Sequence, residues 1–258
     1  MSDWRENPDN IILCEGYHDR AFWSGFLLKS GCQDYRNGQR MATTAAPVNL
    51  KGKYTFISPD GSRLITVQPC QGKTQIWKAL AYFLSNLAIE PKQRIFVSLD
   101  DDHDAVAESY APSSGCQPLE AFLANKFAGQ FSIEGGACLF KPQDSIHPYI
   151  SLINWASAEP ANDNLPGKQT LERLVCAALN LAYPDRAISV KHFLDSRGDG
   201  APAAGVKEFA YSHVAGWFAD EGIEGFYRSI WSKDRIYSFL EDELKKIKIW
   251  DTMHLAMR

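Results

Sequence analysis

The sequence predicts an α/β fold with a mostly parallel central sheet, flanked by helices and followed by a helical C-terminal extension. Two observations support this prediction. Over the first hundred residues, short unbroken apolar runs alternate with segments whose apolar residues recur at helical spacing. Two of the apolar runs also end in acidic residues, and open α/β sheets carry their ligand sites at the carboxyl ends of such buried strands.

The elements of the first half follow one another in the order expected of a parallel sheet. Each apolar run gives a strand, and each stretch of apolar residues at helical spacing gives a helix. In chain order they are a strand over Ile11–Cys14, a helix over about 18–30, the segments "KYTFIS" and "RLITVQPC" around Pro-Asp-Gly, a helix in "GKTQIWKALAYFLSNL" and a strand in "QRIFVSL". The two segments around the turn form either an antiparallel pair or the entry to the second core strand.

The second half is less regular. It predicts helices in "PLEAFLANKFAGQF", over about 168–182, over 207–218 and in the amphipathic tail, a strand in "ACLFKP", and a strand or short helix in "ISVKHFLDS". "PYISLINWASAEPANDNLPG" contains the most loop-like stretch of the chain. We therefore predict a single domain over 1–258, with a core over about 10–215 and a helical extension over about 216–258.

Composition narrows the class of protein. The chain has 258 residues, is 45% hydrophobic and carries a formal net charge of −4, which excludes an overall basic coat but leaves room for a local basic face. The polar start "MSDWRENPDN" does not resemble a signal peptide, and no apolar run approaches the roughly 20 residues that cross a bilayer. None of the six cysteines forms a C-x-x-C pair. We expect a cytoplasmic protein without membrane contact, whose cysteines are buried free thiols.

The acidic residues after two strands predict a metal site. Glu15 follows the first apolar run, and Asp100 and Asp102 follow the run that ends at Leu99. Carboxylates that gather at one sheet edge need a compensating cation, and Mg²⁺ or Mn²⁺ takes such oxygen ligands. If the chain stays extended past Leu99, Asp100 and Asp102 face the same side. Glu15 would then bind the ion or act as a general base.

Three further carboxylates near these positions leave alternatives open. Asp19 lies at the start of the first helix, where it either ligates the metal or only caps the helix. Asp101 and Asp104 belong to the same acidic run as Asp100, so the register of the metal-binding pair is not fixed.

The order of strand, Glu15-Gly16, helix, strand, helix, strand and Asp100-x-Asp102 resembles the TOPRIM domain. This Rossmann-like module is shared by topoisomerases, bacterial primases and nucleases of the overcoming-lysogenization-defect (OLD) type. The chain is most similar to the stand-alone OLD-like branch, because "LPGKQTLERLV" resembles its Gly-x-Leu-Glu helix start and "GVKEFAYSHVAGWFAD" its Lys-led helix. The resemblance implies roles for Glu172 and Lys207.

The resemblance implies a Mg²⁺-dependent endonuclease that cleaves phosphodiester bonds in DNA or RNA. Its catalytic residues would be Glu15, Asp100, Asp102 and Lys207, and its metal ligands Glu15, Asp19, Asp100, Asp102 and Glu172. It further implies the effector of an anti-phage defence system. The ATPase of that system would be a separate partner protein, because "QGKT" lacks the upstream glycine of a P-loop.

Other functions stay open at this stage. One is a catalytically inactive TOPRIM-like binding subunit of a partner complex. Primase or topoisomerase activity is disfavoured, because the chain shows neither a zinc-binding module nor an additional domain for a nucleophilic tyrosine. A receiver-like phosphoacceptor is disfavoured by the number of strands before Asp100. The sequence leaves association with a second copy of the chain undecided.

Overall fold

The chain folds into two compact units. The computed structural model describes residues 9–35, 52–88, 92–103, 115–134, 138–198 and 200–258. The sheet unit comprises Met1–Leu99, Ser114–Ile153 and Asp251–Arg258, and the helical unit comprises Asp100–Ser113 and Asn154–Trp250. Two of the boundaries between the units fall within strands, at Leu99–Asp100 and at Ile153–Asn154.

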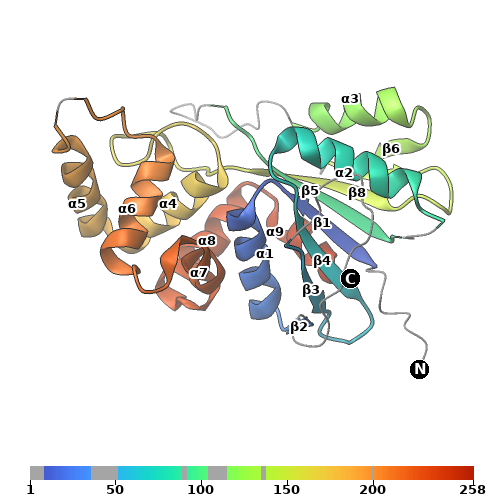
Figure 1. Ribbon diagram of the computed structural model, residues 1–258, viewed down its shortest axis with the longest axis horizontal. Helices are drawn as coiled ribbons and strands as arrows, with labels where there is room; N and C mark the ends of the chain where they lie inside the picture. Colours follow the sequence, from blue (N-terminus) through green and yellow to red (C-terminus); the bar gives the residue numbers. More distant parts are fainter. Residues whose placement is uncertain (1–8, 36–51, 89–91, 104–114, 135–137, 199) are drawn as a thin grey trace. The chain divides into compact units, whose positions relative to one another are not determined.

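The sheet unit is built on an eight-stranded mixed sheet of order β2-β3-β4-β1-β5-β8-β7-β6 (Figure 1). The strands are β1 (Asn10–Cys14), β2 (Gln33–Asp34), β3 (Tyr54–Ile57), β4 (Leu64–Pro69), β5 (Arg94–Asp100), β6 (Phe131–Glu134), β7 (Leu139–Pro142) and β8 (Tyr149–Trp155). β1 pairs in parallel with both β4 and β5. The β2–β3, β3–β4, β6–β7 and β7–β8 pairs are antiparallel. The α/β prediction, with its parallel centre, is confirmed.

Helices cover both faces of this sheet. α2 (Lys73–Ser85) and α3 (Gln117–Lys126) lie on one face, and α1 (Tyr17–Lys29) lies on the other (Figure 1). The alternation of side chains along β1 explains this sandwich: Ile11 and Leu13 share a buried cluster with Ile76 and Leu80 of α2. On the α1 face, the Trp23 indole donates a hydrogen bond of 3.2 Å to the hydroxyl of Ser98.

The C-terminal residues complete the α1 side of the sheet unit. α9 (Trp250–His254) and a 3₁₀ turn (Leu255–Met257) end the chain. The Asn10 side chain donates to the carbonyl of Ala256 over 3.0 Å, and the His254 ring packs edge-on against Phe26. Residues nearly 250 positions apart therefore close one core.

The helical unit contains five α-helices among its described residues. They are α4 (Leu171–Ala182), α5 (Pro184–Asp195), α6 (Val206–Trp217), α7 (Gly222–Ser229) and α8 (Asp234–Lys246), with a 3₁₀ turn at Ile230–Ser232. α4 is buried along most of its length and packs against α6 and α8. The helix predicted over about 168–182 is therefore confirmed, with its first turn at Leu171.

Two strands of the second half were not predicted from the sequence. Tyr149–Trp155, to which no element had been assigned, is the strand β8, because its nearly continuous apolar run is buried next to β5. Phe131–Glu134 is a further strand that was not predicted. The ambiguous segment "ISVKHFLDS" belongs to helix α5, whose first position is Pro184, a favoured place for proline.

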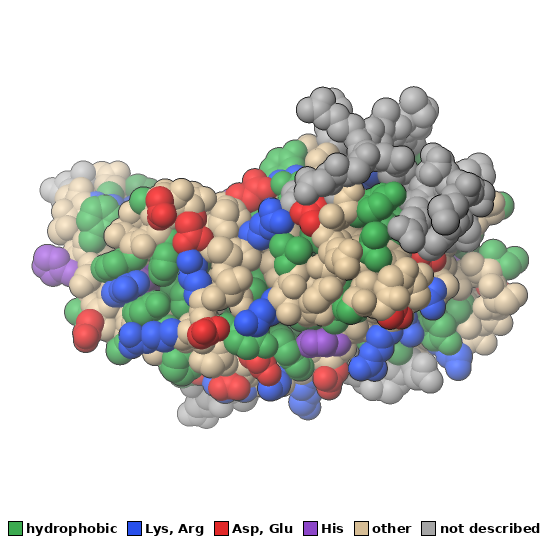
Figure 2. All heavy atoms as spheres, turned by 90° about the horizontal axis from the view of Figure 1, so that it is seen from below, with side chains coloured by type: hydrophobic (Ala, Val, Ile, Leu, Met, Phe, Trp, Pro, Cys, Tyr) green, Lys and Arg blue, Asp and Glu red, His purple; other side chains and the backbone are tan. Residues whose placement is uncertain are grey.

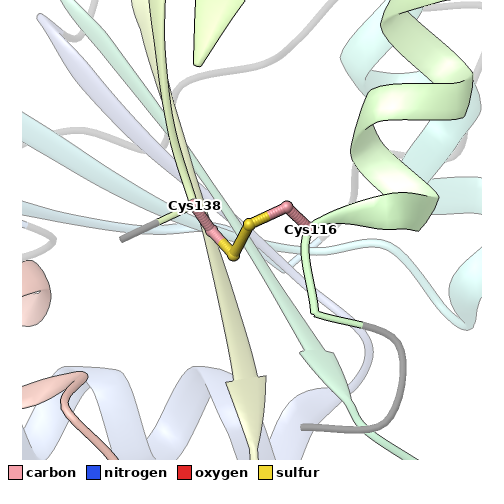
Figure 3. The surroundings of a disulfide bond; sticks show 2 residues. All are labelled: Cys116 and Cys138. Carbon is pink, nitrogen blue, oxygen red and sulfur yellow. A yellow bond between two sulfur atoms is a disulfide. The ribbon is translucent and has the colours of Figure 1, made fainter. Parts of the chain in front are cut away.

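The prediction that all six cysteines are free thiols is wrong for two of them. Cys116 and Cys138 form a disulfide that joins the start of α3 to the start of β7 (Figure 3). The other four, Cys14, Cys32, Cys70 and Cys176, are free and buried as predicted. Spacing alone could not reveal the pair, because the two cysteines meet only after α3 and β6 have folded back. Within the described ranges, no helix combines the length and apolarity needed to span a membrane.

Candidate functional site

The predicted carboxylates follow two neighbouring parallel strands. In the pairing of β1 with β5, Cys14 lies opposite Ser98. Glu15 comes directly after β1, and Asp100 is the last residue of β5. Glu15 belongs to the sheet unit, whereas Asp100 and Asp102 belong to the helical unit.

In the sheet unit, Glu15 lies beside the start of α2. Its carbonyl accepts a hydrogen bond of 2.9 Å from the N–H of Gly72, and its carboxylate lies 3.9 Å from the ammonium of Lys73. Gly72 has a φ of 110°, which an L-residue with a side chain rarely adopts, so this turn requires glycine. The "QGKT" motif therefore places a cation next to Glu15.

Asp19 has the geometry of a helix cap. Its carboxylate accepts a hydrogen bond of 3.1 Å from the N–H of Gly16, the residue that precedes α1. The residue is largely buried, at 8% exposure. This contact supports the capping alternative, and its role as a metal ligand stays a prediction.

The cysteines around Glu15 do not supply a thiolate. Burial raises the pKa of Cys14 well above its usual value, and the nearby charge of Asp19 raises it further. Burial also raises the pKa of Cys70 to about 12. These side chains stay protonated at neutral pH, so the chemistry available around Glu15 is that of carboxylate and ammonium groups.

In the helical unit, Asp100 lies at the N-terminus of α4. One carboxylate oxygen accepts a hydrogen bond of 2.8 Å from the N–H of Leu171, the first residue of that helix. Thr170 is the N-cap, and its hydroxyl accepts from the N–H of Arg173. A carboxylate at this position is stabilised by the positive end of the helix dipole.

The acidic run leaves the extended conformation after Asp101. The N–H of Asp101 still bonds the carbonyl of Trp155, but Asp102 has a φ of 62° and its N–H bonds the carbonyl of Gln169. The premise that Asp100 and Asp102 share one side of an extended chain is therefore wrong. The Asp102 carboxylate instead lies 3.0 Å from the ammonium of Lys168. Asp104 lies outside the described residues.

Glu172 and Lys207 come together across α4 and α6. The Lys207 ammonium lies 3.9 Å from a carboxylate oxygen of Glu172, whose side chain is only 7% exposed. One turn along α6, burial and, to a smaller extent, the charges of Glu172 and Glu208 together raise the pKa of Tyr211 to about 12. Only the family resemblance had linked Glu172 with Lys207, and the structure gives them a direct contact.

A buried polar network holds the acidic run in place. The Gln169 side-chain oxygen accepts a hydrogen bond of 2.8 Å from the N–H of Ser157, and its side-chain nitrogen donates one of 3.0 Å to the carbonyl of Ser157. Its backbone bonds Asp102 and His103. The Ser157 hydroxyl in turn donates to the buried carboxylate of Glu243 over 2.6 Å. The sequence did not predict this network, because Ser157 and Glu243 lie 86 residues apart along the chain.

The carboxylate oxygens suit a hard cation in chemistry but do not form a ready cage. Among the residues that the structure describes, no group of three or more His, Cys, Asp or Glu side chains is arranged to hold a metal ion. Mg²⁺ usually takes only one or two protein carboxylates and completes its shell with water and substrate phosphate. The donor types therefore fit Mg²⁺, provided that substrate supplies part of the shell.

Comparison with known proteins gives a fold relationship. No protein-family model matches the chain, and no curated protein matches it. The crystal structure of a hypothetical protein from Pyrococcus horikoshii OT3 has a similar fold, with a TM-score of 0.70 and 14% sequence identity. The match covers 96% of this chain and 99% of that chain. At this level of identity the likeness concerns the fold alone.

Proposed function

We propose that the chain is a metal-dependent nuclease of TOPRIM type that cleaves phosphodiester bonds in DNA or RNA. The observation that carries the proposal is that Glu15 and Asp100 follow two neighbouring parallel strands, at the end of the sheet where α/β proteins bind their ligands. The proposal includes a role as the effector of an anti-phage system, with the ATPase on a partner chain.

The proposed ligands of the ion are Glu15, Asp100 and Asp102, with Asp19 and Glu172 as further candidates. When bound, Mg²⁺ or Mn²⁺ would neutralise the scissile phosphate and make an attacking water more acidic. The chain's own cations have the chemistry for orienting the phosphate. Lys207 is 60% exposed and offers a mobile ammonium beside Glu172, which suits contact with a phosphate oxygen.

The contacts of Asp100 determine how the proposal must be tested. Alanine at this position would remove both a candidate ligand and the acceptor for Leu171, whereas asparagine keeps an acceptor oxygen and removes only the charge. We would incubate the wild type, Asp100→Asn and Glu15→Gln with plasmid, single-stranded DNA and total tRNA, with Mg²⁺, Mn²⁺ or EDTA. Asp144→Asn, an acid of an exposed turn in the sheet unit, is the matched control.

We expect wild-type cleavage that needs the metal, survives Asp144→Asn and falls at least about a hundredfold in the other two variants, because each removes a ligand charge. Cleavage that persists in both site variants would show that the site is elsewhere. If every substrate stays intact, lysate from phage-infected cells is added as a source of the trigger. Inertness under that condition as well would refute the nuclease assignment.

A second function is favoured by one observation. The carboxylates of Asp100 and Asp102 already contact the N–H of Leu171 and the ammonium of Lys168. Such satisfied acids suit a TOPRIM-like binding subunit that has no catalytic metal. In that case Mg²⁺ would raise the melting temperature or strengthen partner binding, and no substrate would be cut.

A further inference from the structure

A large apolar groove runs along the hairpin of α5 and α6 in the helical unit. Its volume is about 550 Å³. The walls are mostly apolar and include the aromatic rings of Phe193, Tyr211 and Trp217. Phe193 is 58% exposed and Trp217 is 40% exposed, so two of these rings are open to solvent. Monomeric proteins rarely leave such a surface unused.

Two arginines without a carboxylate partner lie at the Trp217 end of the groove. The Arg186 guanidinium lies 3.9 Å from the centre of the Tyr183 ring and 5.2 Å from that of Trp217, and Arg235 lies 4.6 Å from the same Tyr183 ring. Neither arginine forms an ion pair within the described part of the chain, whereas the nearby Lys191 and Lys233 do. Two like charges are thus held against one ring with no anion between them.

A third arginine lies toward the other end. Arg197 lines the groove and is fixed by hydrogen bonds to the carbonyls of Leu194 and Pro202, at 3.0 and 2.9 Å. It too has no ion-pair partner among the residues that the structure covers. Glu208 also lines the groove, but its carboxylate accepts a hydrogen bond from the N–H of Gly205. The groove therefore has guanidinium groups toward both of its ends, with the carboxylate of Glu208 on its wall.

The groove adjoins the pair of residues that the proposed nuclease would use. Tyr211 lines the groove, and its pKa is raised in part by the charge of Glu172, the partner of Lys207. Figure 2 shows hydrophobic side chains interspersed with Lys, Arg, Asp and Glu side chains on the face of the helical unit that it presents. Aromatic rings with unpaired arginines beside them are the elements that bind unstacked bases and their phosphates.

We propose that the α5–α6 groove binds single-stranded nucleic acid, with a base against Trp217 and Phe193 and phosphates on Arg186, Arg197 and Arg235. The choice of ligand rests on the proposed nuclease function. A duplex is disfavoured, because its bases are stacked inside and cannot enter the groove. An apolar peptide is disfavoured, because it would leave the three guanidinium groups without an anion.

The test measures binding without cleavage. Fluorescence anisotropy in EDTA would follow labelled single-stranded DNA and RNA of twelve nucleotides, and a duplex of the same sequence. The site variants are Arg186→Gln with Arg235→Gln, Trp217→Leu, and Gly216→Leu. Gly216 lines the groove and a Cβ there meets no atom within 4 Å, so a larger side chain at this position has open space to enter the groove. Lys191→Gln is the control: it removes one charge from α5, the helix that carries Arg186, but this charge is already paired with Asp195.

We expect the single strands to bind more tightly than the duplex. Trp217→Leu and Gly216→Leu should each weaken binding at least about fivefold, the lower range for a lost stacking contact. Each arginine removed should lower the slope of log affinity against log salt by about 0.7. Lys191→Gln should change neither quantity, and melting curves would confirm that all variants are folded.

Two outcomes would overturn the inference: wild type that binds no single strand, or Lys191→Gln that weakens binding as much as the arginine changes. Binding is measured without metal, so it separates the two proposals. Tight binding without any cleavage would refute the nuclease and keep the groove. If the wild type cleaves with metal and the groove variants bind and cut normally, the groove proposal is refuted and the nuclease proposal is kept.

Discussion

Glu243 of α8 offers the sharpest test of how the acidic run is supported. Its side chain is fully buried. One carboxylate oxygen accepts hydrogen bonds from the Ser157 hydroxyl at 2.6 Å and the Ala158 N–H at 3.0 Å, and the other lies 2.8 Å from the Lys246 ammonium. Burial opposes the charged form of Glu243, but the bonds from Lys246 and Ser157 outweigh it and lower its pKa. The carboxylate is therefore ionised at neutral pH.

Glu243→Ala should lower the free energy of unfolding by about 3 kcal/mol. Removing one partner of a buried pair costs roughly 3–5 kcal/mol, because the other groups are left unsatisfied. The lower end applies, since the Lys246 side chain is 49% exposed and can turn to water. Glu241→Ala is the matched control on the same helix. Its exposed pair with Lys245 is worth only about 0.3–0.5 kcal/mol.

Urea unfolding at pH 7 would measure both variants, with the slope against urea showing whether the transition stays two-state. Hydrogen exchange adds a local readout, because Glu243 acts through Ser157 and Gln169. The amide of Asp102, which bonds Gln169, should exchange faster in Glu243→Ala and not in Glu241→Ala. Equal destabilisation by the two variants, or an unchanged Asp102 amide, would refute the supporting role of this network.

Three further predictions follow from individual contacts. Reduction of the Cys116–Cys138 disulfide should lower the free energy of unfolding by about 3 kcal/mol from the entropy of a loop of 22 residues, and urea curves with and without dithiothreitol would detect it. Burial, with a smaller effect of Arg186, lowers the pKa of His213 to about 4. The stability that the neutral form of His213 provides is therefore present above pH 6.5 and is lost as the pH falls toward 4. In His213→Gln, the melting temperature should depend less on pH over this range. Thr170→Ala should cost about 1 kcal/mol in urea unfolding by removing the N-cap of α4.

The elements that could be predicted from the sequence are those with a strong local pattern. The run Ile11–Leu13 and the helical spacing of Ile76 and Leu80 were enough to place β1 and α2, because each pattern shows which side the element buries. β8 was missed even though its apolar run was visible. The Pro- and Asn-rich segment that follows Trp155 made the whole stretch look loop-like, so no strand was predicted before it.

The candidate site was predictable in part. Glu15 and Asp100 do follow neighbouring strands, since a strand end can be located from where an apolar run stops. The course of the chain beyond Asp101 was not predictable, because it depends on the carbonyls of Trp155 and Gln169, which lie more than 50 residues away. The Lys168 and Tyr211 contacts were missed for the same reason.

The connection between Asn10 and the last residues of the chain has a consequence for folding during synthesis. The first strand of the sheet emerges from the ribosome early, but the groups that satisfy its Asn10 amide belong to residues 256 and 258. The sheet unit therefore cannot complete its core until almost the whole helical unit has been translated. In a nascent chain stalled before residue 250, the α1 side of β1 should stay exposed to solvent. Chaperones would be expected to bind this exposed surface.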